Sequence, residues 1–289
     1  MSISAAQVKE LREKTGAGMM DCKKALTEAN GDFQKAIEIL RKKGASVAAK
    51  RAERSANEGV VITKVSDDYS KGIILEVNCE TDFVANSNDF IQFADFILSA
   101  IEVHNPKNLD ELFSLTHEGK NLKDALTDII GKIGEKIEVS RFAVESSENG
   151  VLVGYIHHGS KLGVLVKADN VKEEGKEDLS IILKDVAMQI AAMKPDYIAP
   201  ENVPAEVIEK EKEIYREVAK KEGKPENILE KIAEGKLKKY YEENTLVEQA
   251  YIKDNTKTIG DLIKEYNKKY SSDAKITLFH RFHLSDENK

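Results

Sequence analysis

The first 45 residues place apolar side chains at helical spacing, in three short runs separated by breaks that contain glycine. The third run begins at residue 33, and Gly44 is expected to end it. These runs predict a three-helix module over residues 1–45, close to the size limit for independent folding. Residues 46–58 are rich in alanine and charge and have little periodicity, so they are expected to form a partly helical linker.

From Gly59 onward the apolar spacing changes to the period of β-strands. The turn signal Ser66-Asp67-Asp68 separates two strand-like runs and predicts a hairpin. Two helical runs and one more strand follow. The predicted elements are strands at 60–65 and 73–77, helices at 90–101 and 122–133, and a strand at 137–144.

The same order of elements then recurs, which predicts a duplicated core. The second set has strands at 151–156 and 162–166, helices at 179–193 and 259–270, and a strand at 276–284. Gly72 and Gly163 match at an offset of 163 − 72 = 91 residues. Arg141-Phe142 and Arg281-Phe282 match at an offset of 281 − 141 = 140 residues, so the second copy is expected to carry an insertion of 140 − 91 = 49 residues.

The insertion is expected at about 197–245, where two helical runs meet at Gly223. They predict an antiparallel helical hairpin roughly 27 Å long, at ~1.5 Å per residue over ~18 residues. An inert spacer stays open as its role. The predicted fold is α+β, with the helical module, a core of two related halves with antiparallel sheets at 59–147 and 148–289, and the inserted hairpin.

The composition of the chain indicates where the protein works and which classes of partner it is expected not to bind. The 289 residues carry 44 Lys and Arg against 51 Asp and Glu, a net charge of −7, which argues against direct nucleic-acid binding. Two cysteines cannot build a disulfide framework, and no window is apolar enough to span a membrane. Since no targeting segment is recognisable at the N-terminus, we expect a cytoplasmic protein that does not bind membranes.

Catalytic fingerprints are missing from the sequence. It contains no P-loop, no dinucleotide-binding glycine motif, no HExxH and no GxSxG. His157 and His158 are adjacent on a predicted strand and point to opposite faces, which disfavours a shared metal. Cys79 could serve as a nucleophile, but Glu80 and Asp82 beside it suppress thiolate formation. We therefore expect no catalytic chemistry, no cofactor and no metal site.

Two segments are unusual for a protein without catalytic motifs. Residues 80–84 lead out of a buried strand with a carboxylate, Asp82, beside an aromatic ring, Phe83. At a loop tip this pair could press a wedge and a charge into a partner, although Phe83 could equally be a core residue. Met19 and Met20 follow Gly18, and a bundle this small cannot bury both, so one is a candidate contact residue.

These two segments resemble the signatures of the elongation factor Ts family, of the bacterial type. One signature, LRxxTGAGMMDCKKAL, covers residues 11–26, and the other, EVNC[QE]TDFVA, covers residues 76–85 without a gap. The resemblance continues through His158-Gly159 and residues 162–166 to the last strand, so it covers nearly the whole chain.

The resemblance implies a guanine nucleotide exchange factor that binds elongation factor Tu in its GDP-bound and nucleotide-free states, in a 1:1 or 2:2 complex. It also implies that the N-terminal module is ubiquitin-associated-like. In the family, one loop disturbs the Mg²⁺ site of the partner, the module grips a helix of its nucleotide domain, and a histidine of the second core half makes a further contact. The matching residues here are, in that order, Thr81, Asp82, Phe83 and Val84; Leu11, Arg12, Met19 and Met20; and His158.

A non-catalytic scaffold or chaperone-like binding module is the alternative. Such a protein would hold a peptide or a ubiquitin-like partner on the helical module without changing nucleotide affinity. The two functions differ in one measurable quantity, the rate of GDP dissociation from elongation factor Tu.

Overall fold

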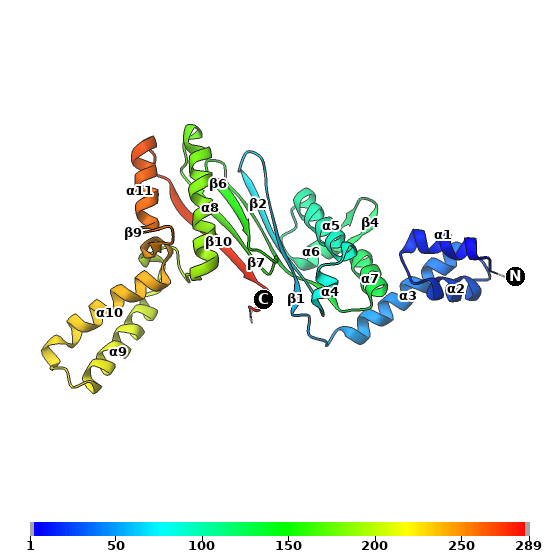
Figure 1. Ribbon diagram of the computed structural model, residues 1–289, viewed down its shortest axis with the longest axis horizontal. Coiled ribbons are helices and arrows are strands. Elements are labelled where there is room, and N and C mark those ends of the chain that lie inside the picture. Colours follow the sequence, from blue (N-terminus) through cyan, green and yellow to red (C-terminus); the bar gives the residue numbers. More distant parts are fainter. Residues whose placement is uncertain (1–2, 287–289) are drawn as a thin grey trace.

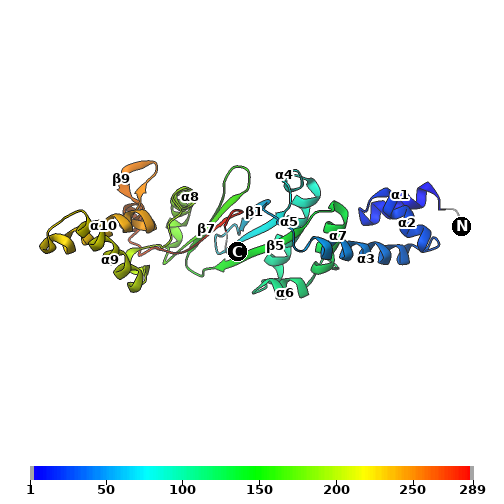
Figure 2. The ribbon, with the colours of Figure 1, turned by 90° about the horizontal axis from the view of Figure 1, so that it is seen from below.

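The computed structural model describes residues 3–286, and these form an elongated molecule of helices and antiparallel strands (Figures 1 and 2). A helical module lies at one end, two sheets with their helices form the centre, and a helical hairpin projects at the other end. The mixed helical and antiparallel composition agrees with the predicted α+β class. None of the helices in residues 3–286 is long and apolar enough to cross a membrane.

The N-terminal module contains α1 (Ala5–Thr15), α2 (Met19–Glu28) and α3 (Phe33–Arg51). A capping box of Ser4 and Gln7 begins α1, and the Asp32 side chain accepts a hydrogen bond from the Lys35 N–H at the start of α3. The buried core of the module is small: Val8, Leu11, Cys22, Ala25, Leu26, Ala29 and Ala36.

The predicted helix stop at Gly44 is wrong. Helix α3 is 19 residues long and continues past Gly44 to Arg51, so the first residues of the predicted linker are helical. Gly44 instead allows a close helix crossing: a Cβ atom there would lie 3.1 Å from the Thr127 carbonyl oxygen of α7 (Leu122–Ile133). A Cβ atom on Gly131 of α7 would lie 3.0 Å from the Gly44 Cα. The module is therefore packed directly on the core.

The first core half has a three-stranded antiparallel sheet in the order β1-β2-β5, with β2 in the centre. Its strands are β1 (Glu58–Val65), β2 (Lys71–Cys79) and β5 (Ile137–Ser146). Besides α7, its helices are α4 (Asp82–Ala85), α5 (Asn88–His104) and α6 (Leu109–Ser114). The short α6 and the hairpin of β3 (Thr116–His117) and β4 (Lys120–Asn121) were not predicted, because their runs are too short to show a period.

The second core half repeats this plan, with a sheet in the order β10-β7-β6. Its strands are β6 (Val151–Ile156), β7 (Leu162–Asp169) and β10 (Lys275–His283). Its main helices are α8 (Lys176–Met193) and α11 (Ile259–Tyr270), preceded by the 3₁₀ turn η1 (Glu173–Gly175) after β7. A further turn, η4 (Leu246–Glu248), and a hairpin of β8 (Ala250–Tyr251) and β9 (Asp254–Thr258) lead into α11.

Strand register confirms the duplication and corrects its offset. Ile73 on β2 faces Val144, while Val164, 91 residues after Ile73, faces Arg281. The matching partners therefore differ by 281 − 144 = 137 residues. Both sheets also change register at the same place, between the pairs of Glu76 and Val77 and 91 residues later. The predicted match of Arg141 with Arg281 is wrong by three positions, and the insertion is 137 − 91 = 46 residues.

The two sheets pack face to face, and helices cover their outer faces (Figure 1). Glycines at equivalent positions bring the sheets close: a Cβ on Gly72 would lie 2.7 Å from Leu165, and one on Gly163 would lie 2.5 Å from Val61. The buried residues between the sheets are Val61, Ile74, Leu152, Leu165, Phe282 and Leu284.

The inserted helices α9 (Ala205–Lys221) and α10 (Leu229–Asn244) form the predicted antiparallel hairpin, which projects from the second half (Figure 1). The turns η2 (Pro200–Asn202) and η3 (Glu226–Ile228) precede its two helices. At its base, Tyr197 and Thr245 form an isolated bridge, and the Leu246 N–H donates to the Tyr197 carbonyl at 2.9 Å. At its tip Gly223 adopts a φ of +75°, a conformation that favours glycine.

Candidate functional site

Helix α4 is a single turn that presents Phe83 to solvent. The Thr81 side chain caps it by accepting a hydrogen bond from the Val84 N–H at 3.4 Å. Phe83 is 85% exposed, which excludes the alternative that its ring belongs to the core. Asp82 is also exposed, while Val84 is half-buried. The predicted loop is therefore a capped turn of helix with an unpaired aromatic ring.

The strand end that carries α4 is held by polar contacts. The Glu80 carboxylate accepts hydrogen bonds from the Lys136 N–H at 2.6 Å and from Arg51 and Arg54 at 3.0 Å each. Burial alone would raise the pKa of Glu80, but the Lys136, Arg54 and Arg51 hydrogen bonds outweigh it and lower the pKa. Glu80 therefore stays ionised at neutral pH.

Cys79 lies behind α4 and is fully buried. Burial and the negative charge of Glu135 raise the pKa of its thiol to about 12, and its Sγ donates to the Thr81 carbonyl at 3.2 Å. A thiol with this pKa is not a nucleophile at neutral pH. Within residues 3–286, His, Cys, Asp and Glu side chains form no group of three or more that could hold a metal ion.

The module presents a second set of exposed side chains. Met19 is 56% exposed and Met20 is 64% exposed, so both methionines, and not only one, reach solvent. Arg12 is exposed as well. Leu11 is different, because its side chain is 0% exposed in the core of the module. Its predicted role as a direct contact residue does not fit this burial, and Leu11 instead supports the surface formed by its neighbours.

Residues of both sets line one groove, although the two segments lie more than 50 residues apart in the sequence; Met20 and Asp82 are not among its lining residues. Arg12 and Met19 from the module and Phe83 from α4 line this groove, which has a volume of about 600 Å³. Lys132 of α7 bridges its two sides: its ammonium group binds Asp89 at 2.7 Å, and its methylene groups pack at Gly16, where an added Cβ would lie 3.0 Å away.

His158 lies in the turn between β6 and β7 and is exposed. The Ser160 carbonyl of this turn accepts the Val61 N–H at 2.7 Å, which ties the turn to the first half. Gly159, Ser160 and Lys161 line a smaller groove of about 220 Å³ together with Asp82. A hydrogen bond to Glu58 and the charges of Glu58 and Asp82 raise the pKa of Lys161, which was not predicted as a site residue.

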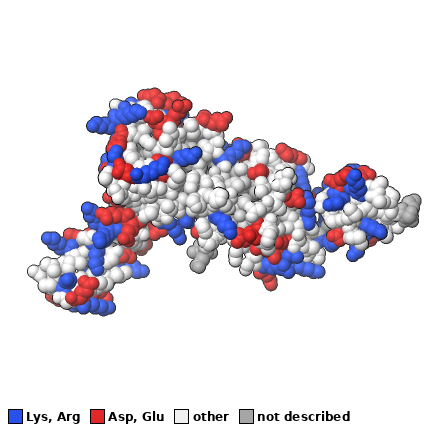
Figure 3. Space-filling model, in the orientation of Figure 1, with Lys and Arg blue, Asp and Glu red and all other residues white. Residues whose placement is uncertain are grey.

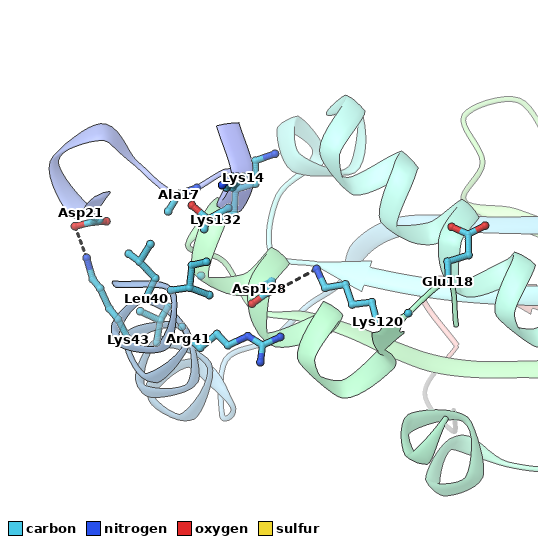
Figure 4. Close-up of a pocket in the computed structure, with 16 residues that line it drawn as sticks. Lys14, Ala17, Asp21, Leu40, Arg41, Lys43, Glu118, Lys120, Asp128 and Lys132 are labelled. Atoms are coloured by element: carbon cyan, nitrogen blue, oxygen red, sulfur yellow. Dashed lines mark hydrogen bonds and ion pairs between the residues drawn. The ribbon is translucent and has the colours of Figure 1, made fainter. Parts of the chain in front are cut away.

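A cleft of about 400 Å³ lies between the module and α7, beside the crossing of Gly44 and Gly131 (Figure 4). Two ion pairs lie within this cleft: Lys43 with Asp21, and Lys120 with Asp128 at 2.8 Å. Arg41 of α3 reaches across to Asp124 of α7 at 3.4 Å. On the face drawn in Figure 3, acidic and basic side chains are interspersed, and the described residues form no continuous basic surface there.

Comparisons with known proteins agree with the resemblance to this family. The family described as Elongation factor TS matches residues 80–286. Elongation factor Ts of Chlorobium phaeobacteroides is 48% identical over 98% of each chain. The Nitratiruptor protein of that name is 50% identical over 99% of this chain and 94% of its own, and the Clostridium perfringens protein is 48% identical over 97% and 92%. The chain therefore belongs to the elongation factor Ts family.

Proposed function

We propose that this protein is a guanine nucleotide exchange factor for elongation factor Tu in translation elongation. It binds the GDP-bound factor, promotes GDP release, holds the nucleotide-free form and leaves when GTP binds. The observation that carries this proposal is the groove where Met19 of the module and the exposed Phe83 of α4 meet. Membership of the elongation factor Ts family supports the choice of partner.

The mechanism rests on differential affinity. Mg²⁺ neutralises the phosphates of GDP in the partner, so a protein that stabilises a conformation with displaced Mg²⁺ ligands weakens GDP binding. By linkage, GDP weakens the binding of that protein equally. Phe83 acts as the wedge, since its ring loses little contact with its own chain on entering a partner pocket. The Asp82 carboxylate disturbs the Mg²⁺ coordination, with Thr81 and Val84 holding the turn.

The module supplies affinity in this account. Met19 and Met20 offer adaptable apolar contacts, and Arg12 offers a charge, to a helix of the nucleotide domain. We infer that the module is ubiquitin-associated-like and that His158 makes a further contact from the second half. The protein contributes no covalent chemistry and no cofactor, works in the cytoplasm, and forms a 1:1 or 2:2 complex.

The test is GDP release from elongation factor Tu loaded with a fluorescent GDP analogue, chased with excess GTP. Substoichiometric wild-type protein accelerates release and turns over. Tight binding with an unchanged GDP dissociation rate would instead identify a scaffold and refute the proposal.

A further inference from the structure

The turn between α7 and β5 forms hydrogen bonds with the two residues that follow β2, as acceptor to one and as donor to the other. The Glu135 carboxylate accepts two hydrogen bonds from Thr81, one from its N–H at 3.1 Å and one from its hydroxyl at 2.8 Å. In return, the Lys136 N–H donates to the Glu80 carboxylate at 2.6 Å. These reciprocal contacts, which we call the strand-end clamp, fix the residue that begins α4.

A third element joins the strand-end clamp. Arg51, the last residue of α3, and Arg54 just beyond it both bind Glu80 at 3.0 Å. The Glu80 side chain is 17% exposed, so these ion pairs are shielded more than ordinary surface pairs. Helix α3 of the module therefore ends in an ion pair with Glu80, the residue before Thr81.

The second core half provides an internal comparison. By the register offsets of 91 and 137, Lys172 stands at the position of Thr81 and Ser272 at that of Glu135. The Ser272 hydroxyl donates to the Asn170 carbonyl at 2.9 Å, and its N–H donates to the Asn267 carbonyl at 3.0 Å. The turn η1, which follows β7 as α4 follows β2, carries Glu174 at the position of Phe83. The second core half thus folds without a carboxylate at the position of Glu135 and without an aromatic residue at the position of Phe83. Glu135 and the exposed aromatic ring therefore occur together in the first half.

We propose that Glu135 is a positioning residue for nucleotide exchange: through Thr81 it holds α4 in the orientation that presents Phe83 and Asp82. This inference rests on the proposed function and adds a residue outside both sequence signatures. A one-turn helix has too few internal hydrogen bonds to hold itself. Because Phe83 packs on little of its own chain, the order of its backbone depends on the contacts at Thr81.

The experiment compares Glu135→Ala, Glu135→Gln and the register-matched control Ser272→Ala. GDP release from elongation factor Tu is followed at increasing concentrations of each variant, which separates the maximal rate from the half-saturating concentration. Hydrogen exchange of the Thr81 and Val84 amides is measured on each free variant. It reports the order of α4 without the partner.

Glu135→Ala lowers the maximal release rate about tenfold, as expected if α4 is competent in about one tenth of molecules. The half-saturating concentration changes less than twofold, and both amides exchange faster. Glu135→Gln, which can still accept the Thr81 N–H, keeps at least a third of the rate, and Ser272→Ala matches wild type.

The proposal is overturned by a maximal rate for Glu135→Ala within twofold of wild type, or by unchanged exchange of both amides. A loss for Glu135→Gln as large as for Glu135→Ala also overturns it, because the charge and not the positioning would then matter. If wild type itself fails to accelerate release, the proposed function fails, and the amide exchange still tests the strand-end clamp.

Discussion

Replacement of Gly131 by alanine tests whether the module is docked on the core in solution. An added Cβ at Gly131 would lie 3.0 Å from the Gly44 Cα, a backbone atom that cannot rotate away. Carbon atoms prefer separations of about 3.5–4.0 Å, so α3 and α7 must part by a few tenths of an ångström. Gly235 on α10 is a matched control, because an added Cβ there would meet nothing within 4 Å.

The magnitude follows from two opposing terms. Glycine to alanine inside a helix stabilises by about 0.5–1 kcal/mol, and this gain applies to both positions. Overpacking at the Gly131 crossing costs about 1–3 kcal/mol. Gly235→Ala is therefore expected to raise the free energy of unfolding by about 0.5–1 kcal/mol, and Gly131→Ala is expected to fall below it by about 1–3 kcal/mol.

The assay is urea unfolding followed by two signals. Residues 1–51 contain no tyrosine, and the chain has no tryptophan, so tyrosine fluorescence reports the core and the inserted hairpin but not the module. Circular dichroism reports the module as well. In wild type the two transitions coincide. In Gly131→Ala the circular dichroism transition begins at lower urea, because the displaced module loses its support. If Gly131→Ala is as stable as Gly235→Ala and its transitions still coincide, the reasoning about the helix crossing is refuted.

Three further outcomes are expected. Leu11→Ala destabilises the module by about 2–5 kcal/mol because Leu11 is fully buried, whereas Met20→Ala changes stability by less than about 0.5 kcal/mol; equal thermal shifts would contradict this difference. Cys79 is buried and its thiol has a pKa of about 12, so it resists alkylation at pH 8 in the native protein and reacts in urea. Alkylation of Cys79 in the native protein within seconds would contradict its burial. Cys79→Ser retains full exchange activity. Contacts lower the folded pKa of Glu80 below its usual 4.5, so the stability that ionised Glu80 gives the folded protein is complete above pH 4.5 and is lost as the pH falls through the folded pKa. The difference in unfolding free energy between wild type and Glu80→Gln is therefore constant from about pH 8 to 5.5 and shrinks below pH 4.5. A difference that varied near pH 7 would refute this role of Glu80.

Periodicity predicted the elements that are long enough to show it. The helices α5, α7, α8 and α11, the β1–β2 and β6–β7 hairpins and the inserted helical hairpin all followed from spacing together with turn residues. Short elements such as α6 gave no period. The prediction at Gly44 was wrong for a different reason. Glycine often ends a helix, but it also permits two helices to cross closely, and only the position of α7 distinguishes the two roles.

The candidate site was predicted in part because its exposed residues stand out locally. An aromatic beside a carboxylate at a strand end and two adjacent methionines are visible in sequence, and the structure exposes Phe83, Met19 and Met20. The sequence indicated the burial of Leu11 only through its place on the apolar face of a predicted helix. Glu135 could not be found, because it lies 54 residues from Thr81 and carries no motif. The strand register supplies that connection.

The most direct test of the central claim is the effect of Phe83→Ala on the maximal rate of GDP release from elongation factor Tu. Ile181→Ala on α8 is the control, since Ile181 is also a large apolar residue and is 66% exposed, but lies on the second core half. The account predicts that Phe83→Ala lowers the maximal rate at least tenfold with unchanged stability, while Ile181→Ala matches wild type. Equal maximal rates for the two variants and wild type would contradict it.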